Sequence, residues 1–283
     1  MSNASDAVLY VVATPIGNLA DMVPRAVEVL QSVALIAAED TRHSRRLLDH
    51  FSIGTRCVSH HDHSSDAEQA AVLATLRDGR SVALISDAGT PLISDPGYRL
   101  VDGALRAGFR VVPIPGACAA IAALSAAGLP TDRFVFEGFL SAKAAARAQR
   151  LQELAREPRT LVFYEAPHRL LETLQAMRAA FGDAREVVLA RELTKLHETI
   201  KRDALSALCG WVAADANQQR GECVLLVRGH IAADGEDARS EQILKTLLEE
   251  LPLKQAAALA AKLSGRKKNE LYELALRWQR GDA

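Results

Sequence analysis

Asp87 and Gly89 lie in the segment SDAGTP (residues 86–91), which directly follows the apolar run SVALI. A carboxylate at a strand end would stand beside a bound ligand, and glycine permits close backbone approach or a positive φ angle. Pro91 removes one amide donor and stiffens the turn. A phosphate would be repelled by the carboxylate and would find no lysine here. The segment therefore favours a ligand that carries hydroxyls, an amine or a positive centre.

Three more loops with glycine, proline or charged residues follow predicted strands: ATPIGNL (13–19), AEDTRH (38–43) and PIPGACAA (113–120). Because ligands bind at the carboxyl ends of the strands in open α/β sheets, the four loops together predict a binding edge. The segment PGACAA offers amide groups at a helix start and leaves room for a flat base. S-adenosylmethionine (SAM), with ribose hydroxyls, an ammonium group and a sulfonium, meets these requirements. Asp95, just before Pro96, is expected instead to cap the following helix.

Asp40, Arg42 and His43 are the candidates for proton transfer beside that edge. Asp40 or His43 could accept a proton from an attacking hydroxyl, and Arg42 could neutralise a phosphate. The alternative is a helix cap for Asp40 and a solvated helix face for Arg42. The sequence does not decide between these readings, nor whether a catalytic base exists.

Two further clusters carry ionisable side chains. In ARELTK (190–195), Arg191 and Lys195 suit phosphate neutralisation, although a plain salt-bridged loop has the same composition. In SHHDHS (59–64), His61 and His63 flank Asp62. We expect this string to be a polar surface loop, with RNA contact or proton handling as the second interpretation. A metal site comes third, so no metal is predicted.

The elements that must position these loops alternate along the first half of the chain. Apolar runs typical of strands cover 8–13, 33–38, 81–86 and 110–114. Segments with helical periodicity cover 23–31, 42–50, 66–78 and 96–107. Strands that alternate with short helices predict βαβ units and a mostly parallel sheet.

The second half begins after GLPTDR (128–133), where glycine, proline and aspartate cluster at a predicted domain boundary. Strands are predicted at 134–139, 160–164, 186–191 and 222–227, and helices at 143–156, 168–181 and 203–215, which together indicate a mixed sheet. A polar linker at 231–241 leads to helices at 241–250, 253–263 and 268–280. Gly265 should end the middle helix. The predicted domains are therefore an α/β domain at 1–130, a second at 131–232 and a helical extension at 238–283.

Composition limits the class of protein. Of 283 residues 49% are hydrophobic and 24% charged, with a net charge of -1. No apolar run reaches the roughly 18 residues of a membrane span, and the first ten residues do not resemble a signal peptide. Four dispersed cysteines indicate small buried thiols in a reducing compartment. The expected location is the cytoplasm, and any RNA contact must come from local basic patches.

Several long segments of the chain are similar to those of a known family. They are TPIGNLAD, LIAAEDTRHSRRLL, ALISDAGTPLISDPGYRLV, RVVPIPGACAAIAALSAAGLPTDRF, FYEAPHRL, ARELTK and LPLKQAAALAAKLSGRKKNELY. In this order, from about residue 10 to the C-terminus, they resemble the tetrapyrrole (corrin and porphyrin) methylase superfamily, in its branch that methylates ribosomal RNA. The resemblance implies two α/β domains with a SAM cleft between them and a helical RNA-binding extension. It also implies a homodimer, and 2'-O-methylation of a cytidine in small-subunit (16S) rRNA near the decoding centre.

Carried over by position, the resemblance assigns the binding residues. The cofactor-binding residues would be Thr14, Pro15, Gly17, Asp87, Ala88, Gly89, Thr90, Ala117, Cys118 and Tyr164. The RNA-binding residues would be Arg191, Lys195, Arg266, Lys267 and Lys268. The chain departs from the family pattern at Ala13, where proline is expected, and in the less basic segment KAAAR (143–147).

Two other functions remain open on the sequence. One is a superfamily relative that methylates a tetrapyrrole or a protein side chain, against which the basic C-terminal helices argue. The other is a non-catalytic RNA-binding or assembly protein, which would fail to bind SAM.

Overall fold

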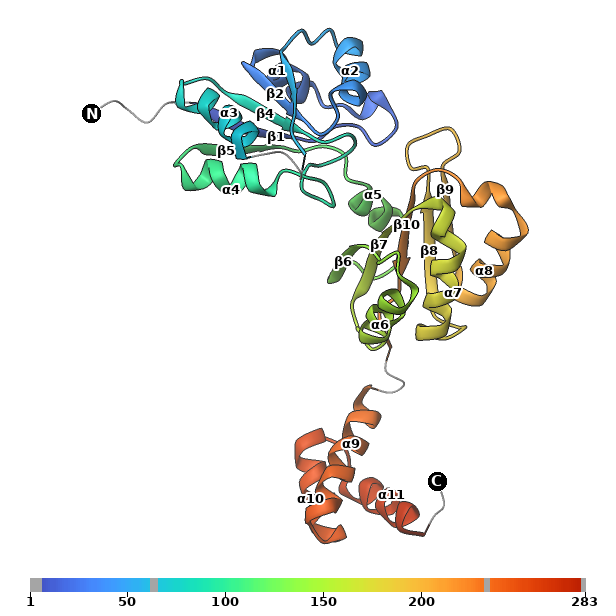
Figure 1. Cartoon of the computed structure of the whole chain (residues 1–283). Helices are drawn as coiled ribbons and strands as arrows, with labels where there is room; N and C mark the ends of the chain where they lie inside the picture. Colours follow the sequence, from blue (N-terminus) through green and yellow to red (C-terminus); the bar gives the residue numbers. More distant parts are fainter. Residues whose placement is uncertain (1–6, 62–65, 232–234, 281–283) are drawn as a thin grey trace. The chain divides into compact units, whose positions relative to one another are not determined.

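The computed structural model describes residues 7–61, 66–231 and 235–280 (Figure 1). Its chain forms two compact units: residues 1–155 with 159–228, and residues 156–158 with 229–283. The first unit contains two five-stranded sheets, and the second contains three helices. Within the described residues, no helix has both the length and the apolar character to cross a membrane.

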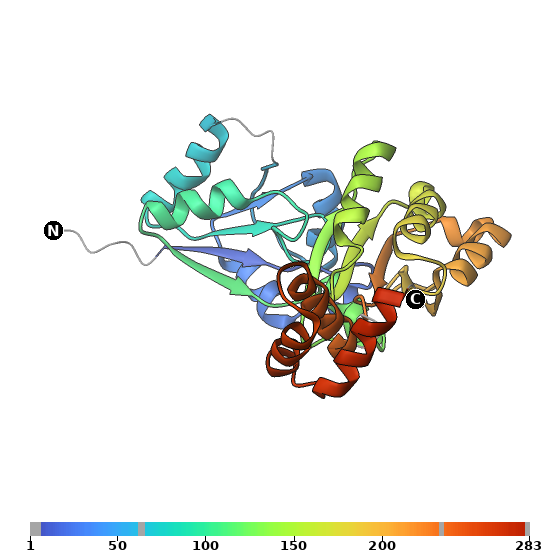
Figure 2. The same ribbon diagram turned by 90° about the horizontal axis from the view of Figure 1, so that it is seen from below.

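The first sheet is wholly parallel, with strand order β3-β2-β4-β1-β5. Strands β1 and β5 run side by side in both ribbon views (Figures 1 and 2). The strands are β1 (Val8–Val12), β2 (Leu35–Ala38), β3 (Cys57–Ser59), β4 (Val82–Ile85) and β5 (Arg110–Ile114). Since β4, β1 and β5 are neighbours, the three loops that follow them meet at one edge.

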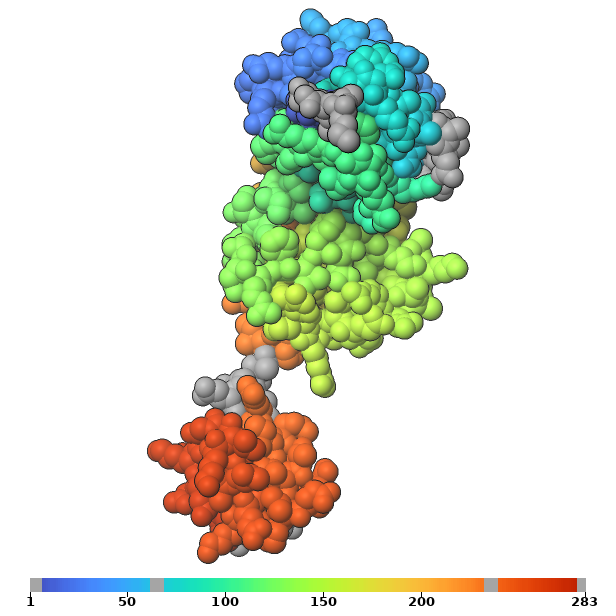
Figure 3. Space-filling model, turned by 90° about the vertical axis from the view of Figure 1, so that its left-hand side faces the viewer, coloured from blue at the N-terminus to red at the C-terminus, as the bar shows by residue number. Residues whose placement is uncertain are grey.

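Helices cover both faces of the first sheet. Because successive side chains of a strand point to opposite faces, alternate strand residues pack into two separate cores. Helices α1 (Pro24–Ser32) and α2 (Thr41–His50) pack on one face through Leu30 and Leu48. Helices α3 (Asp66–Arg77) and α4 (Tyr98–Arg106) pack on the other through Leu76 and Leu100. The space-filling view shows α3 and α4, in cyan to green, on the outer surface of this half (Figure 3). The predicted parallel α/β sheet is confirmed.

The second sheet is mixed, with strand order β6-β7-β10-β8-β9 and parallel pairing only between β6 and β7. Its strands are β6 (Phe134–Phe139), β7 (Thr160–Glu165), β8 (Glu186–Arg191), β9 (Thr199–Ala204) and β10 (Cys223–Val227). Helices α6 (Ala144–Leu154), α7 (Leu170–Phe181) and α8 (Leu205–Ala214) share a core with one face. Helix α5 (Ala119–Ala126), which follows the first sheet in the chain, packs on the other face. Short 3-10 turns complete the unit at Leu19–Asp21, Pro167–Arg169 and Ala216–Gln219.

Strands β3 and β9 are absent from the sequence prediction. Strand β3 has only three residues, and β9 reads TIKRDA, an edge strand whose polar side chains hide the pattern of a sheet. The helix predicted from residue 96 begins two residues later, at Tyr98. These differences lie at sheet edges and element ends, where hydrophobic patterning carries least information.

The C-terminal unit consists of α9 (Gly235–Glu250), α10 (Leu253–Ser264) and α11 (Lys268–Arg280). Its own small core contains Leu244, Ala257 and Leu271. Helix α9 begins six residues before the predicted residue 241, so the predicted linker was too long. Gly265 adopts a left-handed conformation (φ 78°) and ends α10, as predicted.

Candidate active site

Hydrogen bonds join three loops at the carboxyl edge of the first sheet. They are the first loop (residues 13–18), the second loop (86–97) and the third loop (115–118), which follow β1, β4 and β5. The Thr14 amide donates to the Gly89 carbonyl at 2.9 Å, and the Gly89 amide donates back to Thr14 at 3.0 Å. The Thr90 hydroxyl donates to the Ala117 carbonyl of the third loop at 2.9 Å. The three loops therefore form one continuous wall.

Left-handed backbone conformations concentrate in the second loop. Gly89 has φ 84°, Leu92 has φ 73° and Ser94 has φ 65°. The conformation is ordinary for glycine, whereas leucine and serine adopt it at a cost of about 1–3 kcal/mol each. Such strained residues cluster at ligand-binding segments, because the surrounding structure must hold them in place.

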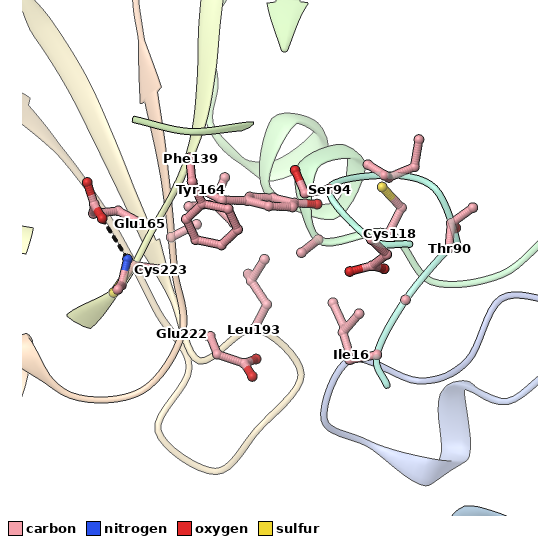
Figure 4. A pocket seen from close by; sticks show the side chains of 18 of the residues that line it. Ile16, Thr90, Ser94, Cys118, Phe139, Tyr164, Glu165, Leu193, Glu222 and Cys223 are labelled. Atoms are coloured by element: carbon pink, nitrogen blue, oxygen red, sulfur yellow. Dashed lines mark hydrogen bonds between the residues drawn. The ribbon is translucent and has the colours of Figure 1, made fainter. Parts of the chain in front are cut away.

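A cavity of about 320 Å³ lies between this wall and the second sheet (Figure 4). The first sheet's loops contribute Gly89, Thr90 and Cys118, and the second sheet contributes Tyr164 and Leu193. Most of the lining is apolar, and we call this space the first cavity. Its shape and apolar walls suit an organic ligand of moderate size held by few polar groups.

Asp95 lines the first cavity and does not cap α4, so the expected helix cap was wrong. The N-cap of α4 is Gly97, whose φ of 125° excludes most other residues, and no side chain caps the helix. Burial, with smaller repulsions from Glu39 and Asp87, raises the pKa of Asp95 to about 6 against a hydrogen bond from Ser86. A half-buried carboxylate in an apolar cavity is well placed to bind a cation.

Tyr164 reaches from β7 toward Ser94 and Cys118 (Figure 4). Its hydroxyl oxygen accepts a hydrogen bond from the Ala120 amide at 3.1 Å, which satisfies one amide at the start of α5. Burial raises the pKa of Tyr164, so the phenol stays neutral at physiological pH. The tyrosine therefore links the two sheets and closes one side of the cavity.

A second cavity of about 600 Å³ adjoins the first. It is lined by Thr14, Pro15 and Gly17 of the first loop, and it is more polar because His43, Arg46, Asp87 and Lys195 also contribute. Ile16, Ala88 and Glu222 line both cavities. The two spaces therefore share a wall.

The predicted cofactor residues thus divide between the two cavities. Ala88, Gly89, Thr90, Cys118 and Tyr164 line the first. Thr14, Pro15, Gly17 and Asp87 line the second, where Asp87 accepts a hydrogen bond from the Asp40 amide at 3.1 Å. Ala117 lines neither cavity, but its carbonyl accepts the Thr90 hydroxyl.

Of the three predicted catalytic residues, His43 alone lines one of these two cavities. Asp40 is the N-cap of α2, accepting the Arg42 amide at 2.8 Å, and this hydrogen bond holds the pKa of Asp40 below its usual value. Arg42 has a side chain that is 92% exposed and points to no cavity wall. Asp40 is therefore a helix cap and Arg42 lies on a solvated helix face, which is the alternative that the sequence left open.

Arg191, which the sequence assigned to RNA binding, is buried, and its guanidinium is occupied by protein acceptors. Its guanidinium donates to the carbonyl oxygens of Arg220 and His197 and to the Thr199 hydroxyl. The bonds to His197 and Thr199 join the two ends of the loop between β8 and β9 (the β8–β9 loop, residues 192–198), and the bond to Arg220 connects them to the segment before β10. Arg191 is thus a structural residue.

Lys195 projects from the β8–β9 loop into the wall of the second cavity. Its ammonium group donates to Glu192 Oε1 at 2.9 Å and to Glu222 Oε2 at 3.0 Å. Sequence reasoning missed Glu222, which directly precedes the buried strand β10. A charged residue at the start of an apolar run was the available signal, but a solvated first residue of a strand gives the same pattern.

Metal ligation finds no support in the described part of the chain, which contains no cluster of three or more His, Cys, Asp or Glu side chains fit to hold an ion. Asp62 and His63, two residues of the string considered for a metal, lie outside the described residues. All four cysteines are free thiols. Cys118 and Cys223 line the first cavity, and burial raises the pKa of Cys223 to about 12.

The first cavity fits SAM by its chemistry. The carboxylate of Asp95 can pair with the positive charge of such a ligand, and the apolar walls can contact an adenine-sized group. Hydroxyls or an amine of the ligand can donate hydrogen bonds to carbonyl groups of the strained second loop. Tyr164, Cys118 and the second loop are the residues that would hold it.

Comparisons with known proteins agree with this chemistry. The family described as Tetrapyrrole (Corrin/Porphyrin) Methylases matches residues 8–209, and the RsmI C-terminal HTH domain matches residues 234–279. The chain is 61% identical to a ribosomal RNA small subunit methyltransferase I of Pseudomonas aeruginosa, over 96% of this chain and 97% of the relative. It is 56% identical to the protein of the same name from Escherichia coli O157:H7, over 96% and 95%.

The fold is also found in solved structures. A cobalt precorrin-4 methyltransferase of cobalamin biosynthesis matches with a TM-score of 0.61 and 17% identity, over 81% of this chain and 97% of that one. A uroporphyrin-III-C-methyltransferase from Thermus thermophilus matches with a TM-score of 0.55 and 21% identity, over 78% and 94%. The predicted SAM-dependent methyltransferase with two α/β parts and a helical extension is confirmed, and the chain belongs to the tetrapyrrole (corrin/porphyrin) methylase family.

Proposed function

We propose that the chain transfers a methyl group from SAM to the 2'-hydroxyl of a cytidine in small-subunit (16S) ribosomal RNA, near the decoding centre. The observation that carries the proposal is the shared wall between an apolar cavity with one carboxylate and a larger polar cavity. A methyl donor and a nucleotide acceptor need two such neighbouring spaces. The names of the relatives at 61% and 56% identity support ribosomal RNA as the acceptor.

The first cavity is proposed as the donor site. SAM supplies an activated methyl group when it is bound there. Asp95 balances its positive charge, Gly89 and Thr90 present backbone groups, and Cys118 and Tyr164 enclose it. Asp87, which the sequence assigned to the cofactor, faces the acceptor side in this proposal, because it lines the second cavity.

The second cavity is proposed as the acceptor site. Its volume of about 600 Å³ accommodates a nucleotide, and His43 and Arg46 supply positive or hydrogen-bonding groups for a phosphate. Because a base in a structured RNA must leave its stack to enter a cavity, this site requires an accessible or extruded cytidine.

The C-terminal helices are proposed to bind the RNA backbone. Arg266 and Lys267 lie between α10 and α11, Lys268 is the first residue of α11, and the side chain of Lys267 is 86% exposed. Arg266 and Lys267 pair with Glu270 of α11 at 3.3 and 4.0 Å, although cations at the start of a helix interact unfavourably with its dipole. The match to a helix-turn-helix domain supports a nucleic-acid contact. In this proposal the domains are residues 1–130, 131–232 and 238–283.

A homodimer and a cytoplasmic location complete the proposal. Large apolar side chains are exposed on the first unit, among them Tyr98 and Leu105 of α4 and Ile121 of α5. A protein interface would cover exposed apolar side chains of this kind. Measurement of the mass in solution by light scattering tests the dimer, and a mass of one chain would exclude it.

The activity is tested with labelled SAM and small ribosomal subunits that lack the modification. Label should appear in 16S rRNA at a cytidine whose 3' phosphodiester resists alkali, since a 2'-O-methyl group blocks that cleavage. Naked 16S rRNA in a parallel reaction distinguishes free RNA from the assembled subunit as substrate. Absence of label in both would contradict the proposal, and label in a tetrapyrrole or a protein would establish the alternative acceptor.

A further inference from the structure

The shared wall of the two cavities is the place where a methyl group must cross from donor to acceptor. Glu222 lines both cavities, and Lys195 lines the acceptor cavity with its ammonium group 3.0 Å from the Glu222 carboxylate. Figure 4 shows Glu222 facing the first cavity beside Leu193. A paired acid and base group therefore stands at the junction.

Lys195 is held in this place from both sides. Its ammonium also donates to Glu192, whose carboxylate accepts the Glu222 amide at 2.9 Å, while the Glu192 amide donates to the Glu222 carbonyl at 2.9 Å. Its stem lies against Gly17 of the first loop, where a Cβ atom would stand 2.5 Å from Lys195 Cγ. A side chain at Gly17 would therefore displace the lysine.

The β8–β9 loop stores backbone strain to present this lysine. Glu192 has φ 52° and Thr194 has φ 67°, left-handed conformations that neither residue type favours. A solvated surface lysine would not require such a backbone. Strain of this kind, persisting where the surrounding structure fixes it, indicates a position with a defined task.

Protonation decides which role each group can take. Burial alone would lower the pKa of Lys195, but Glu192 and Glu222 outweigh it and raise that pKa above its usual value. Lys195 is therefore an ammonium donor at physiological pH and cannot act as a base. Within the described chain two of its three hydrogens have partners, Glu192 and Glu222, which leaves one for a ligand in the second cavity.

We propose that Lys195 and Glu222 are catalytic residues: Lys195 donates a hydrogen bond to the acceptor hydroxyl oxygen, and Glu222 accepts its proton. This inference rests on the proposed function. As the carbon–oxygen bond forms and the carbon–sulfur bond breaks, the electron pair of the broken bond returns to sulfur. The hydroxyl proton passes to Glu222 and then to solvent, which reaches this 71% exposed side chain. The ammonium stabilises the negative charge that develops on the oxygen.

Single-turnover methylation of small subunits at saturating labelled SAM tests the assignment. We expect Lys195→Met to lower the rate constant by about 10²–10³-fold, the usual effect of losing one such donor. Lys195→Arg should restore part of the rate, because a guanidinium also donates. Glu222→Gln should slow transfer by about 10²-fold or more, because general-base assistance is lost. The affinities of all three variants for SAM and for subunits, measured separately, should stay near those of the wild type.

Lys201→Met is the matched control. Lys201 is 31% exposed and paired with Asp203, much as Lys195 is 28% exposed and paired with Glu222, but it lines neither cavity. A Lys195→Met rate equal to that of this control would overturn the inference. So would an unchanged rate constant with weakened subunit binding, since Lys195 would then be a phosphate contact. A wild-type enzyme that left the RNA unlabelled would overturn the proposed function as well, which separates the two failures.

Discussion

Ionisation of the Asp95 carboxylate lowers the free energy of unfolding but favours the binding of a cationic ligand. The folded protein holds its proton more tightly than the unfolded chain, because the pKa rises from 3.8 to about 6. The free energy of unfolding therefore falls as pH rises from about 4 to 6, and the cost is complete above pH 6. The pKa difference corresponds to about 3 kcal/mol, which solvent around this half-buried group reduces to about 1–2 kcal/mol.

Asp95→Asn should therefore stabilise the ligand-free protein by about 1–2 kcal/mol at pH 7 and by much less at pH 4. The same change should weaken SAM binding about 10–100-fold, because a charge-assisted contact is lost. Affinity of the wild type should rise with pH through about 6, whereas that of the variant should not. Denaturant unfolding and calorimetry at both pH values measure these effects. Equal pH profiles for the two proteins would contradict the role of Asp95.

Residue types in the loops were predictable, but the cavity that each side chain faces was not. Gly89 and Thr90 follow a buried strand, and that order alone places them at the ligand edge. Asp87 and Asp95 are eight residues apart in one loop, and only the left-handed turns at Leu92 and Ser94 bring Asp95 back to the first cavity. Because non-glycine residues rarely adopt left-handed conformations, no sequence pattern predicts these turns.

At the scale of elements, the hydrogen bond from Thr90 to the Ala117 carbonyl joins the second and third loops. Thr90→Val keeps the shape of the side chain and removes the donor, which costs about 0.5–1.5 kcal/mol. We expect the two loops to separate slightly and SAM affinity to fall by up to about tenfold, with the fold intact. Calorimetric titration measures the change. Thr75→Val, which removes a hydroxyl bond to Ala71 within α3, is the control and should bind SAM normally. A wild-type affinity for Thr90→Val would show that the loops hold their positions without this bond.

Apart from β3 and β9, the strands of both sheets were predicted from their apolar runs, since a strand covered on both faces is apolar throughout. Strand β9 was not predicted because apolar and polar residues alternate only weakly in TIKRDA. The strand lies at a sheet edge, where few of its side chains need to be buried. Its partner β8 reads EVVLAR and was predicted at its observed bounds. Local sequence thus predicts buried strands such as β8 better than edge strands such as β9, although both flank the β8–β9 loop.

At the scale of the whole chain, α5 connects the two halves of the first unit in a way that no local pattern predicts. It follows β5 of the first sheet, yet Ala123 and Leu124 pack in one core with Val162 and Val224 of the second. Its sequence, AAIAALSA, is apolar on nearly all sides and so does not specify which sheet it covers. Tyr164 completes the connection through the Ala120 amide.

The C-terminal helices have their own core, so their surface charge can be changed without disturbing the first unit. We expect Lys267→Glu combined with Lys268→Glu to weaken binding to small subunits and to leave SAM affinity unchanged. The slope of log K against log salt should fall by about 2, because each lost phosphate contact removes about one counterion. The double variant Lys254→Glu with Arg277→Glu changes the net charge of the same helices equally, at exposed positions outside the basic turn between α10 and α11. Equal losses in the two double variants would assign the effect to net charge, whereas a loss confined to the first identifies that turn as the contact with RNA.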